Sequence, residues 1–345
     1  MKRFVILLTA LVICISAAVI AEESVLIDFN TLEVDYAPGG GDPTENEATL
    51  IDFSQKAGTG FSEEEKAMMK TSLALENWNV ILASSSRTVY NQANSLAKAV
   101  PVREDAKKFA GDTVLGVRVH FPLNDYNSWA MVEPPFEIPV YMKKTEIGDD
   151  GALVPVEEDV NRTKFDGYGV VKNVGVIKSV SMNVLGLNFP MGCEVILKDH
   201  TNKELALDMG YLYFDGWRTL TWENPNYITQ VRDRELRRFP LYPRATPSIK
   251  LSGIRFRRDK EQEGGNFITY VKDISVTYDK AVLDLDTDIN NEEVWGILGE
   301  REESRRTAEF ERLGEVQVLR ALEKKKMHME PEELEEGDEA VEAEE

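Results

Sequence analysis

The sequence predicts a mainly β protein: an antiparallel β-sandwich of the jelly-roll type, followed by a C-terminal helix and an acidic, disordered tail. Three observations predict this fold class. Apolar and polar residues alternate from about residue 24 to residue 279, which is typical of strands with one buried and one solvated face. Turn residues interrupt the alternation at intervals, and no strand–helix–strand rhythm occurs. After about residue 292 the chain is rich in Glu, Arg, Leu and Ala, which favours a helix.

The composition limits the classes of function. The 345 residues include 40 Lys and Arg against 61 Asp and Glu, a formal charge of −21. Such an acidic chain is unsuited to nucleic acid, whose phosphates need a net basic face, and to simple adhesion on anionic lipid. Two cysteines cannot build a disulfide framework, and three histidines leave little room for a histidine-built metal or catalytic site. We therefore expect no catalytic residue, no cofactor and no metal.

Residues 1–21 have the pattern of a secretory signal peptide. Lys2 and Arg3 form a positive start, an apolar run follows, and small residues end at Ala21 before Glu22. The alternative is a membrane anchor, but acidic, strand-like sequence follows directly, without a flank that would stop transfer. Cleavage between Ala21 and Glu22 removes two bases, so the formal charge falls from −21 to −23. It leaves Cys193 as the only thiol, and we expect that thiol to be buried and inert.

The first two strands are expected at residues 25–29 and 50–53, because both contain the string Leu-Ile-Asp-Phe. Residues 37–43, rich in Gly and Pro, form a loop between them by composition. Two matching strands with such a loop predict neighbouring or paired positions in one sheet.

Later strands are marked by period-two patterns. In residues 115–121 and 174–184 the apolar residues alternate with polar ones, which places one face of each strand in the core. Ile268, Tyr270 and Ile274 share one parity and are expected on one buried face. The apolar parity changes at Gly253, where a β-bulge would restore the register.

Two helices are expected. Ser62 and Glu65 form a capping box that opens a short helix ending at Met69. The second helix runs from about Glu292 to Met327. Its apolar residues recur every three positions, so the stripe drifts by about 60° per step and winds around the helix. We expect this helix to dock on the body or on a neighbour rather than to form a regular coiled coil; the stripe consists of Phe310, Leu313, Val316, Leu319 and Leu322.

These features divide the chain into four parts. They are the signal peptide (1–21), the sandwich body (22–283), a hinge with the C-terminal helix (284–329) and the disordered tail (330–345). The tail contains ten acids and no base, a composition that does not fold alone.

Asp284, Asp286 and Asp288 in the hinge suggest a calcium site. An EF-hand loop would need glycine at Ile289 and a carboxylate at Trp295, so that motif does not fit. A looser calcium site and a solvated hinge that caps the next helix both stay open at this point.

Aromatic residues are the main candidates for contact with a ligand, because sandwiches of this type often bind sugars by stacking rings on aromatic faces. Tyr126 and Trp129 lie in a polar segment and are expected in a loop, where they are candidate ligand or partner contacts. Trp217 and Trp222, five residues apart on one strand, point to opposite faces and cannot form one stacking platform. At least one of these two is expected in the core.

The clearest local charge feature is basic. Residues 232–260 contain ten bases against three acids within a strongly acidic chain. Ion pairs within the body would account for such a cluster. The alternative is a surface that meets an acidic partner, the chain's own tail or a neighbouring copy. Arg255, Arg257 and Arg258 are the candidate contacts of that surface.

Five segments of the mature chain together resemble a known family: residues 22–29, 48–53, 77–80, 115–122 and 216–220. The chain resembles the flagellar filament outer-layer (sheath) proteins of spirochaetes across essentially its whole mature region. The resemblance implies a periplasmic, non-enzymatic subunit that coats a core of flagellin-like proteins and stiffens or shapes the filament for motility. No site residue follows from it, because it rests on the ensemble of segments rather than on a catalytic signature.

Two functions follow as hypotheses. The first is a structural sheath subunit of the periplasmic flagellum. Its partners are flagellin-like core proteins and copies of itself, with neither nucleic acid nor a stable membrane anchor after signal cleavage. The second is an exported carbohydrate-binding β-sandwich module, which the jelly-roll pattern together with Tyr126 and Trp129 motivates.

Overall fold

The structure is a computed structural model that describes residues 21–35, 49–123, 126–140, 145–147, 153–155, 165, 167–227, 238–239, 247–283 and 294–328. The chain forms two units. Unit 1 contains Met1–Thr31, Asn79–Glu133 and Gly167–Gly296, and unit 2 contains Leu32–Trp78, Pro134–Asp166 and Ile297–Glu345. Residues 22–283, expected as one body, are thus divided between both units. Most of the signal peptide, the three hinge aspartates and the acidic tail lie outside the described residues.

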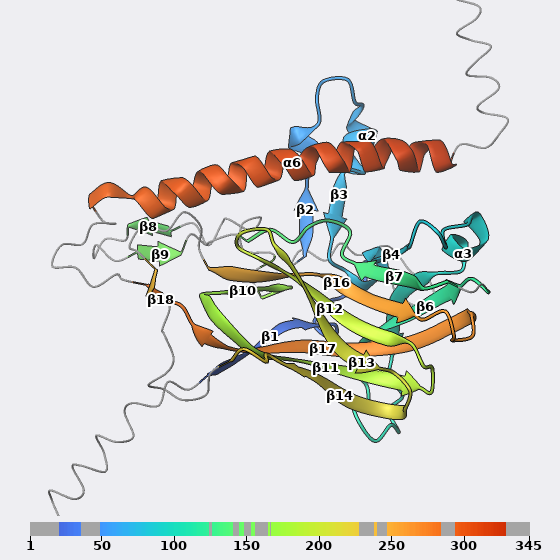
Figure 1. Ribbon diagram of the computed structural model, residues 1–345. Coiled ribbons are helices and arrows are strands. Elements are labelled where there is room, and N and C mark those ends of the chain that lie inside the picture. The colour runs from blue at the N-terminus through green and yellow to red at the C-terminus, as the bar shows by residue number, and fades with distance from the viewer. Residues whose placement is uncertain are drawn as a thin grey trace, which may run out of the picture. The chain divides into compact units, whose positions relative to one another are not determined.

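Unit 1 is an antiparallel β-sandwich, which confirms the predicted fold class. Among the described residues it has two six-stranded sheets, which face each other in Figure 1 and are named here after their central strands. The β17 sheet consists of β1 (Glu22–Asp28), β5 (Leu96–Pro101), β6 (Thr113–Phe121), β11 (Val174–Leu187), β14 (Asp215–Glu223) and β17 (Gly265–Lys280). The β16 sheet consists of β4 (Asn79–Leu82), β7 (Ser128–Glu133), β10 (Val170–Lys172), β12 (Gly192–Asp199), β13 (Glu204–Tyr211) and β16 (Ser248–Arg258).

The central strand β17 changes partner halfway along one edge. Its other edge pairs with β11. On the edge of β17 opposite β11, residues 265–271 pair with β6 and residues 273–278 pair with β1. The register against β11 shifts between Val271 and Asp273, so Lys272 is the extra residue of a β-bulge.

The bulge at Lys272 reverses which side chains of β17 face the core. Phe267 and Val271 are buried before it, and Ile274 is buried after it. Ile268 and Tyr270 are only partly buried, on the outer face. The prediction that Ile268, Tyr270 and Ile274 share one buried face is therefore wrong, because an extra residue between them changes the parity.

The central strand β16 repeats this arrangement in the other sheet. It pairs with β12 on one edge, and on the other edge with β10 over residues 248–250 and with β7 over residues 254–258. The register shifts at Ser252, next to Gly253, which confirms the predicted bulge. A Cβ atom on Gly253 would lie 2.6 Å from the carbonyl oxygen of Val132, so the backbones approach too closely there for any larger residue.

The two sheets enclose an apolar core. The rings of Phe256, from the β16 sheet, and Phe267, from the β17 sheet, have centroids 5.2 Å apart. The predicted alternation of 115–121 and 174–184 is confirmed, since Val119 and Met182 are among the residues that are fully buried. Cys193 also lies in this core with no exposure, as predicted, and burial raises the pKa of its thiol.

A buried charge cluster lies at the bulge of β17. The Lys272 side chain is 6% exposed, and its ammonium lies 2.5 Å from Oδ1 of Asp28 and 3.7 Å from Oδ2 of Asp112. The Lys272 carbonyl accepts a hydrogen bond from the Phe29 amide at 3.0 Å. Because Asp28 is the last residue of β1, these contacts fix the end of the first strand against β17.

Unit 2 contains short paired strands. β2 (Leu50–Asp52) pairs with β3 (Lys70–Ser72), and β8 (Thr145–Ile147) pairs with β9 (Leu153–Pro155). The two Leu-Ile-Asp-Phe strings therefore lie in different sheets, since the first belongs to β1 and pairs with β17. The prediction that they are neighbours is wrong, because four shared residues specify a strand with one buried face but do not specify its partner.

Short helices connect the strands: η1 (Ser54–Lys56), α2 (Glu63–Ala67) and η2 (Leu75–Asn77) in unit 2, and α3 (Val89–Ala93) in unit 1. The predicted capping box of α2 is confirmed. The Glu65 amide donates to Ser62 Oγ at 3.2 Å, and the Ser62 amide donates to Glu65 Oε2 at 2.9 Å. The helix ends at Ala67 rather than at Met69, because the Met68 cap turns its amide back to the Glu65 carbonyl.

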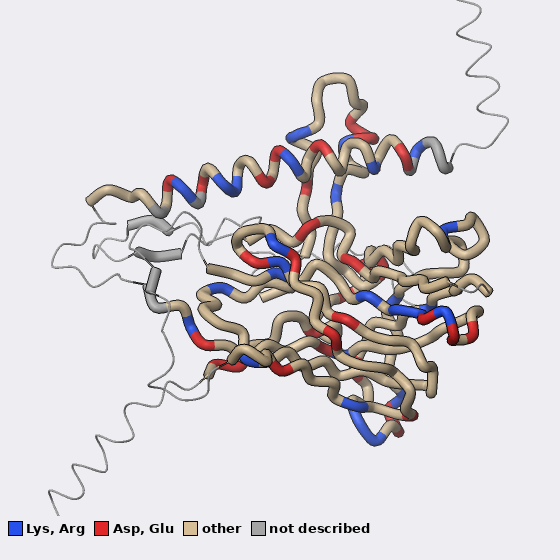
Figure 2. The backbone as a smooth tube through the Cα atoms, viewed as in Figure 1, with Lys and Arg blue, Asp and Glu red and all other residues tan. Residues whose placement is uncertain are grey.

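The predicted C-terminal helix is confirmed as α6 (Ile297–His328), 32 residues long. Charged residues of both signs are interspersed along it (Figure 2). Within unit 2, the ring of Phe310 packs on Phe53 with centroids 6.4 Å apart, and Lys325 pairs with Glu65 at 3.1 Å.

The apolar stripe of α6 winds around the helix, as predicted. Leu313 is buried, whereas Leu319 is 61% exposed. The buried face instead continues through Gln317, four positions after Leu313, because four residues nearly complete one turn.

Replacing the buried lysine of the β17 bulge should destabilise the sandwich. Lys272→Met leaves the Asp28 and Asp112 carboxylates without their cation. We therefore expect the free energy of unfolding to fall by about 2 kcal/mol. This is less than for a fully buried pair, because both carboxylates are partly exposed. Urea unfolding followed by tryptophan fluorescence measures it. The matched control is Lys280→Met on the same strand, whose partner Glu22 is also on β1 but in an exposed pair. An equal decrease in the free energy of unfolding in both variants would contradict a special contribution from the buried Lys272 cluster.

Asp273, next to the bulge, should give a pH dependence of stability. Burial raises the pKa of its carboxyl above the ordinary 3.8, and the hydrogen bond from Asn183 opposes that shift. As the pH is lowered, the Asp273 carboxyl of the folded chain therefore binds its proton at a higher pH than that of the unfolded chain. Wild type should gain stability relative to Asp273→Asn as the pH falls from neutral toward 3.8. Urea midpoints across that range measure the gain, with Asp215→Asn on β14 as an exposed control. A difference that stays constant with pH would contradict the burial.

Candidate functional site

The pairing of β7 with β16 brings together two features that are far apart in the sequence. Trp129 lies opposite Arg257, and Ser128 lies opposite Arg258. The aromatic pair of residues 126 and 129 and the basic cluster of residues 255–258 are therefore adjacent in space. Trp129 belongs to β7 itself rather than to a loop, so its predicted loop position is wrong. The alternation within β7 places its side chain on the outer face of the sheet, 40% exposed.

A cross-strand row runs over the outer face of the β16 sheet. Gly192 of β12 is paired with Tyr211 of β13 on one side and with Arg257 of β16 on the other, and Arg257 is paired with Trp129 of β7. The row thus reads Tyr211, Gly192, Arg257 and Trp129 across four adjacent strands, and we call it the aromatic row. Tyr211 is 50% exposed. Each end of the row is therefore an accessible aromatic ring.

Carboxylates hold the two arginines of the outer face. Arg257 lies 2.8 Å from Glu194 Oε1 and 3.4 Å from Asp208 Oδ2. Arg255 donates from Nε to Glu194 Oε2 at 2.6 Å and forms an ion pair with the same carboxylate through its terminal nitrogen. Glu194 is buried between them. Ion pairing within the body, one of the two explanations of the basic cluster, is thus what the structure describes for Arg255 and Arg257.

Arg258 differs from its two neighbours because it is 3% exposed. Its Nε donates to the Gln262 carbonyl at 3.0 Å, and its terminal nitrogen donates to the Tyr126 carbonyl at 3.2 Å. The Tyr126 hydroxyl in turn donates to the Ser85 carbonyl at 2.7 Å, and its ring is 43% exposed. Arg258 therefore positions the segment that leads into β7 and is not itself a surface charge.

The turn between β16 and β17 fixes the other ring of the aromatic row. The Tyr211 hydroxyl donates to Asp259 Oδ2 at 2.9 Å, and this hydrogen bond raises the pKa of the phenol. Gln262 holds Asp259, because its side-chain oxygen accepts from the Asp259 amide at 3.1 Å. The same Gln262 donates to the Pro190 carbonyl at 2.5 Å. The hydroxyl of Tyr211 is therefore held by a network that includes the β16–β17 turn and the loop at Pro190.

Sequence reasoning missed Tyr211 and Glu194. The available signal for Glu194 was a carboxylate within the otherwise apolar strand at residues 193–197, which needs a cationic partner when it is buried. Tyr211 has no comparable signal, since its place in the row depends on a bulge in β13 at Met209.

Trp217 and Trp222 lie on β14 of the other sheet, and neither is in the core. The expectation that at least one is buried is wrong: β14 is the terminal strand of the described β17 sheet, and both side chains are only partly buried. Trp217 instead packs edge-on against Phe109, with centroids 4.9 Å apart.

Several other expected features fall partly or wholly outside the described residues. No side-chain position is described for Arg232, Arg234, Arg237, Arg238 or Arg244 of the basic cluster. At the expected cleavage site, Ala21 is described and Glu22 is the first residue of β1. Within the described part of the chain, no group of three or more His, Cys, Asp or Glu is arranged to hold a metal ion. No described helix has the length and apolar character needed to span a membrane.

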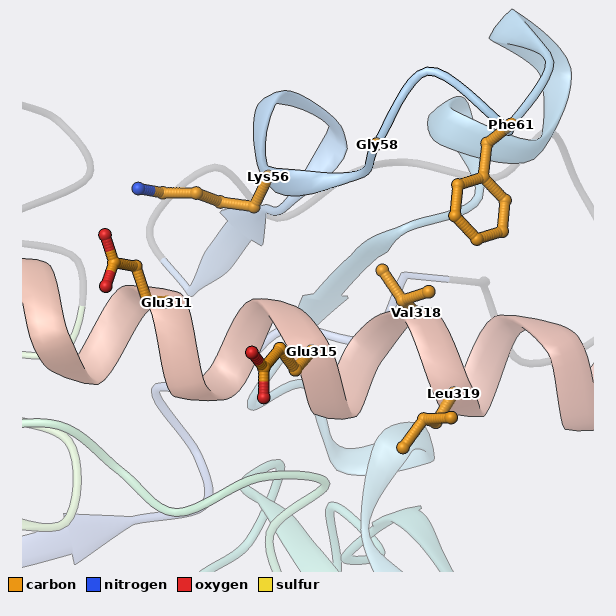
Figure 3. A pocket seen from close by; sticks show the side chains of 7 residues that line it. All are labelled: Lys56, Gly58, Phe61, Glu311, Glu315, Val318 and Leu319. Carbon is orange, nitrogen blue, oxygen red and sulfur yellow. The ribbon is translucent and has the colours of Figure 1, made fainter.

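A hollow lies entirely within unit 2, along α6. Its volume is about 510 Å³, and its lining residues are Lys56, Gly58, Phe61, Glu311, Glu315, Val318 and Leu319. Figure 3 shows Phe61 above Val318, with the carboxylates of Glu311 and Glu315 farther along the helix. Its lining thus mixes apolar and acidic side chains.

Comparisons with known proteins identify the family. The family model described as Flagellar filament outer layer protein Flaa matches residues 42–287. A flagellar filament outer layer protein of Spirochaeta aurantia is 48% identical over 95% of this chain and 94% of its own length. A protein of the same description from Treponema pallidum is 43% identical over 95% of this chain and 95% of its own length. One from Borreliella burgdorferi is 33% identical over 81% of this chain and 77% of its own length.

Among solved structures, one of carbohydrate-binding modules from the β-sandwich superfamily aligns with 59% of this chain and 58% of its own, at 13% identity and a TM-score of 0.29. A likeness of that size carries no argument about this chain. The sequence relatives do identify the family, because the similarity of the first two extends over 95% of this chain. They confirm the resemblance noted from the sequence: the chain belongs to the flagellar filament outer layer protein family.

Proposed function

We propose that this protein is a structural subunit of the outer layer of the flagellar filament. The observation that supports this is the 48% identity over 95% of the chain to a protein of that description. Identity at this level over both units favours one shared role for the whole chain rather than one borrowed domain. The proposal includes no enzymatic activity, since the relatives are named for a layer of the filament and not for a reaction.

The finer part of the proposal is a periplasmic location reached by signal-peptide cleavage after Ala21. The fold supports this boundary. Glu22 is the first residue of β1 and pairs with Tyr278, and its carboxylate lies 2.6 Å from the Lys280 ammonium. Cleavage after Ala21 would therefore leave the first strand complete and remove only residues that precede it.

The proposed partners are flagellin-like core proteins and neighbouring copies of the same subunit. Tyr126, Trp129, Arg255 and Arg257 are proposed as contact residues. Their exposure supports a contact role, and Glu194 and Asp208 together balance the charges of the two arginines on this surface. A surface with paired charges suits close approach between acidic subunits, because it limits their mutual repulsion. Arg258, which is buried, would act only by holding Tyr126 in place.

Isolated filaments should contain this protein, and its deletion should make them thinner. We expect electron microscopy of purified filaments from a deletion strain to show a smaller diameter, and swimming assays to show altered motility. The wild-type filament diameter and the wild-type motility should both return when the intact gene is restored. Filaments that lack the protein in the wild type, or an unchanged diameter after deletion, would contradict the proposed function.

The filament-bound form should begin at Glu22. Mass spectrometry of the N-terminal peptide from purified filaments measures this directly. Because residues 1–21 form no part of β1, we expect their absence to leave the fold intact. A filament-bound chain that retains Met1 would contradict export by signal cleavage.

A further inference from the structure

The aromatic row defined above has the dimensions of an extended binding surface. Its two rings, Trp129 and Tyr211, lie on strands separated by three strand intervals, or about 14 Å. Both side chains are on the outer face, 40% and 50% exposed. Two rings at that separation on the outer face of one sheet form an open surface rather than a closed pocket.

Hydrogen-bonding groups fill the space between the rings. A Cβ atom on Gly192 would lie 3.2 Å from Nε and from a terminal nitrogen of Arg257, so the guanidinium lies directly over this glycine. Asp208, whose side chain is 60% exposed, borders the guanidinium at 3.4 Å. The middle of this surface therefore presents a planar donor group next to an accessible carboxylate acceptor.

This surface is held in place before any ligand arrives. Asp259 fixes the hydroxyl of Tyr211, and Glu194 fixes the guanidinium of Arg257. A surface that is ordered in advance loses less conformational entropy on binding.

We propose that the aromatic row binds a neutral saccharide chain. The two rings would stack on the apolar faces of separate sugar units, as amphipathic aromatic side chains do, and the groups between them would hydrogen-bond the hydroxyls. Glu194 and Asp208 balance Arg255 and Arg257 in charge, which favours a neutral ligand over an anionic one.

The arrangement fits a saccharide better than a protein partner. A protein hot spot places its aromatic anchors in a closely packed, desolvated pocket. Here a glycine and an arginine separate the two rings, so polar groups lie between two accessible rings at the ends of the row. The row shares Trp129 and Arg257 with the contact residues proposed above, and the two roles are distinguished because sugar binding and incorporation into a filament are measured separately.

Calorimetry on the purified mature chain tests the proposal, with cellotetraose and N-acetylchitotetraose as neutral probes and a hyaluronan tetrasaccharide as the anionic one. We expect at least one neutral probe to bind with Kd below about 1 mM and the anionic probe to bind more weakly. Trp129→Ala should weaken binding by about fivefold to tenfold, because it removes a stacking ring. Tyr211→Ala should do the same, whereas Tyr211→Phe keeps the ring and should cost less.

The matched control is Trp217→Ala, which removes a partly exposed tryptophan from the other sheet and should leave Kd unchanged. Equal urea midpoints for the variants establish that they are folded. The proposal is overturned if neither neutral probe binds, or if Trp129→Ala and Trp217→Ala bind as wild type does. Loss of filament incorporation in Trp129→Ala, without measurable saccharide binding in wild type, would assign the row to a protein contact instead. Saccharide binding by a chain absent from filaments would overturn the proposed function and leave this site standing.

Discussion

At Lys272 a single strand stops pairing with β6 and starts pairing with β1, and the ammonium buried there is neutralised by Asp28 and Asp112. This exchange lets one 16-residue strand hold the N-terminal strand and an internal strand on the same edge. The bulge that permits it also reverses the side-chain parity, so both halves of β17 present apolar residues to the core. The sheet depends on these two effects together. Without the change of parity, the apolar side chains of one half of β17 would face solvent instead of the core.

The other sheet uses the same device, and the candidate site results from it. β16 leaves β10, passes through the bulge at Gly253 and then pairs with β7. Only because of that second pairing does Trp129 lie beside Arg257. The guanidinium can then reach over Gly192, whose missing side chain leaves room for it. A backbone irregularity in the centre of the sheet thus determines which side chains become neighbours on its surface.

Local patterns in the sequence predicted local structure well. The capping box at Ser62 and the bulge at Gly253 each depend on a few consecutive residues, and both are confirmed. The winding stripe of α6 follows from helix geometry over residues 310–322, and it is confirmed as well, as is the burial of Cys193. Pairing between distant segments was not predictable in the same way. The two Leu-Ile-Asp-Phe strings pair with different strands, and the side chains of Ile268 and Tyr270 lie on the outer face because of a bulge without a glycine to mark it. At the site, Tyr126, Trp129 and the three arginines were identified individually, but their proximity is a property of the β7–β16 register.

Cys193 lies within the sandwich, opposite Phe256, with no access to solvent. In an oxidising compartment, accessible thiols on subunits packed side by side would form disulfides between neighbours. Complete enclosure of the Cys193 thiol prevents this chemistry at that residue, and its raised pKa keeps the sulfur protonated. Any layer built from this chain through its folded surfaces would therefore contain no covalent cross-link through Cys193, so its subunits would be joined there by non-covalent contacts alone.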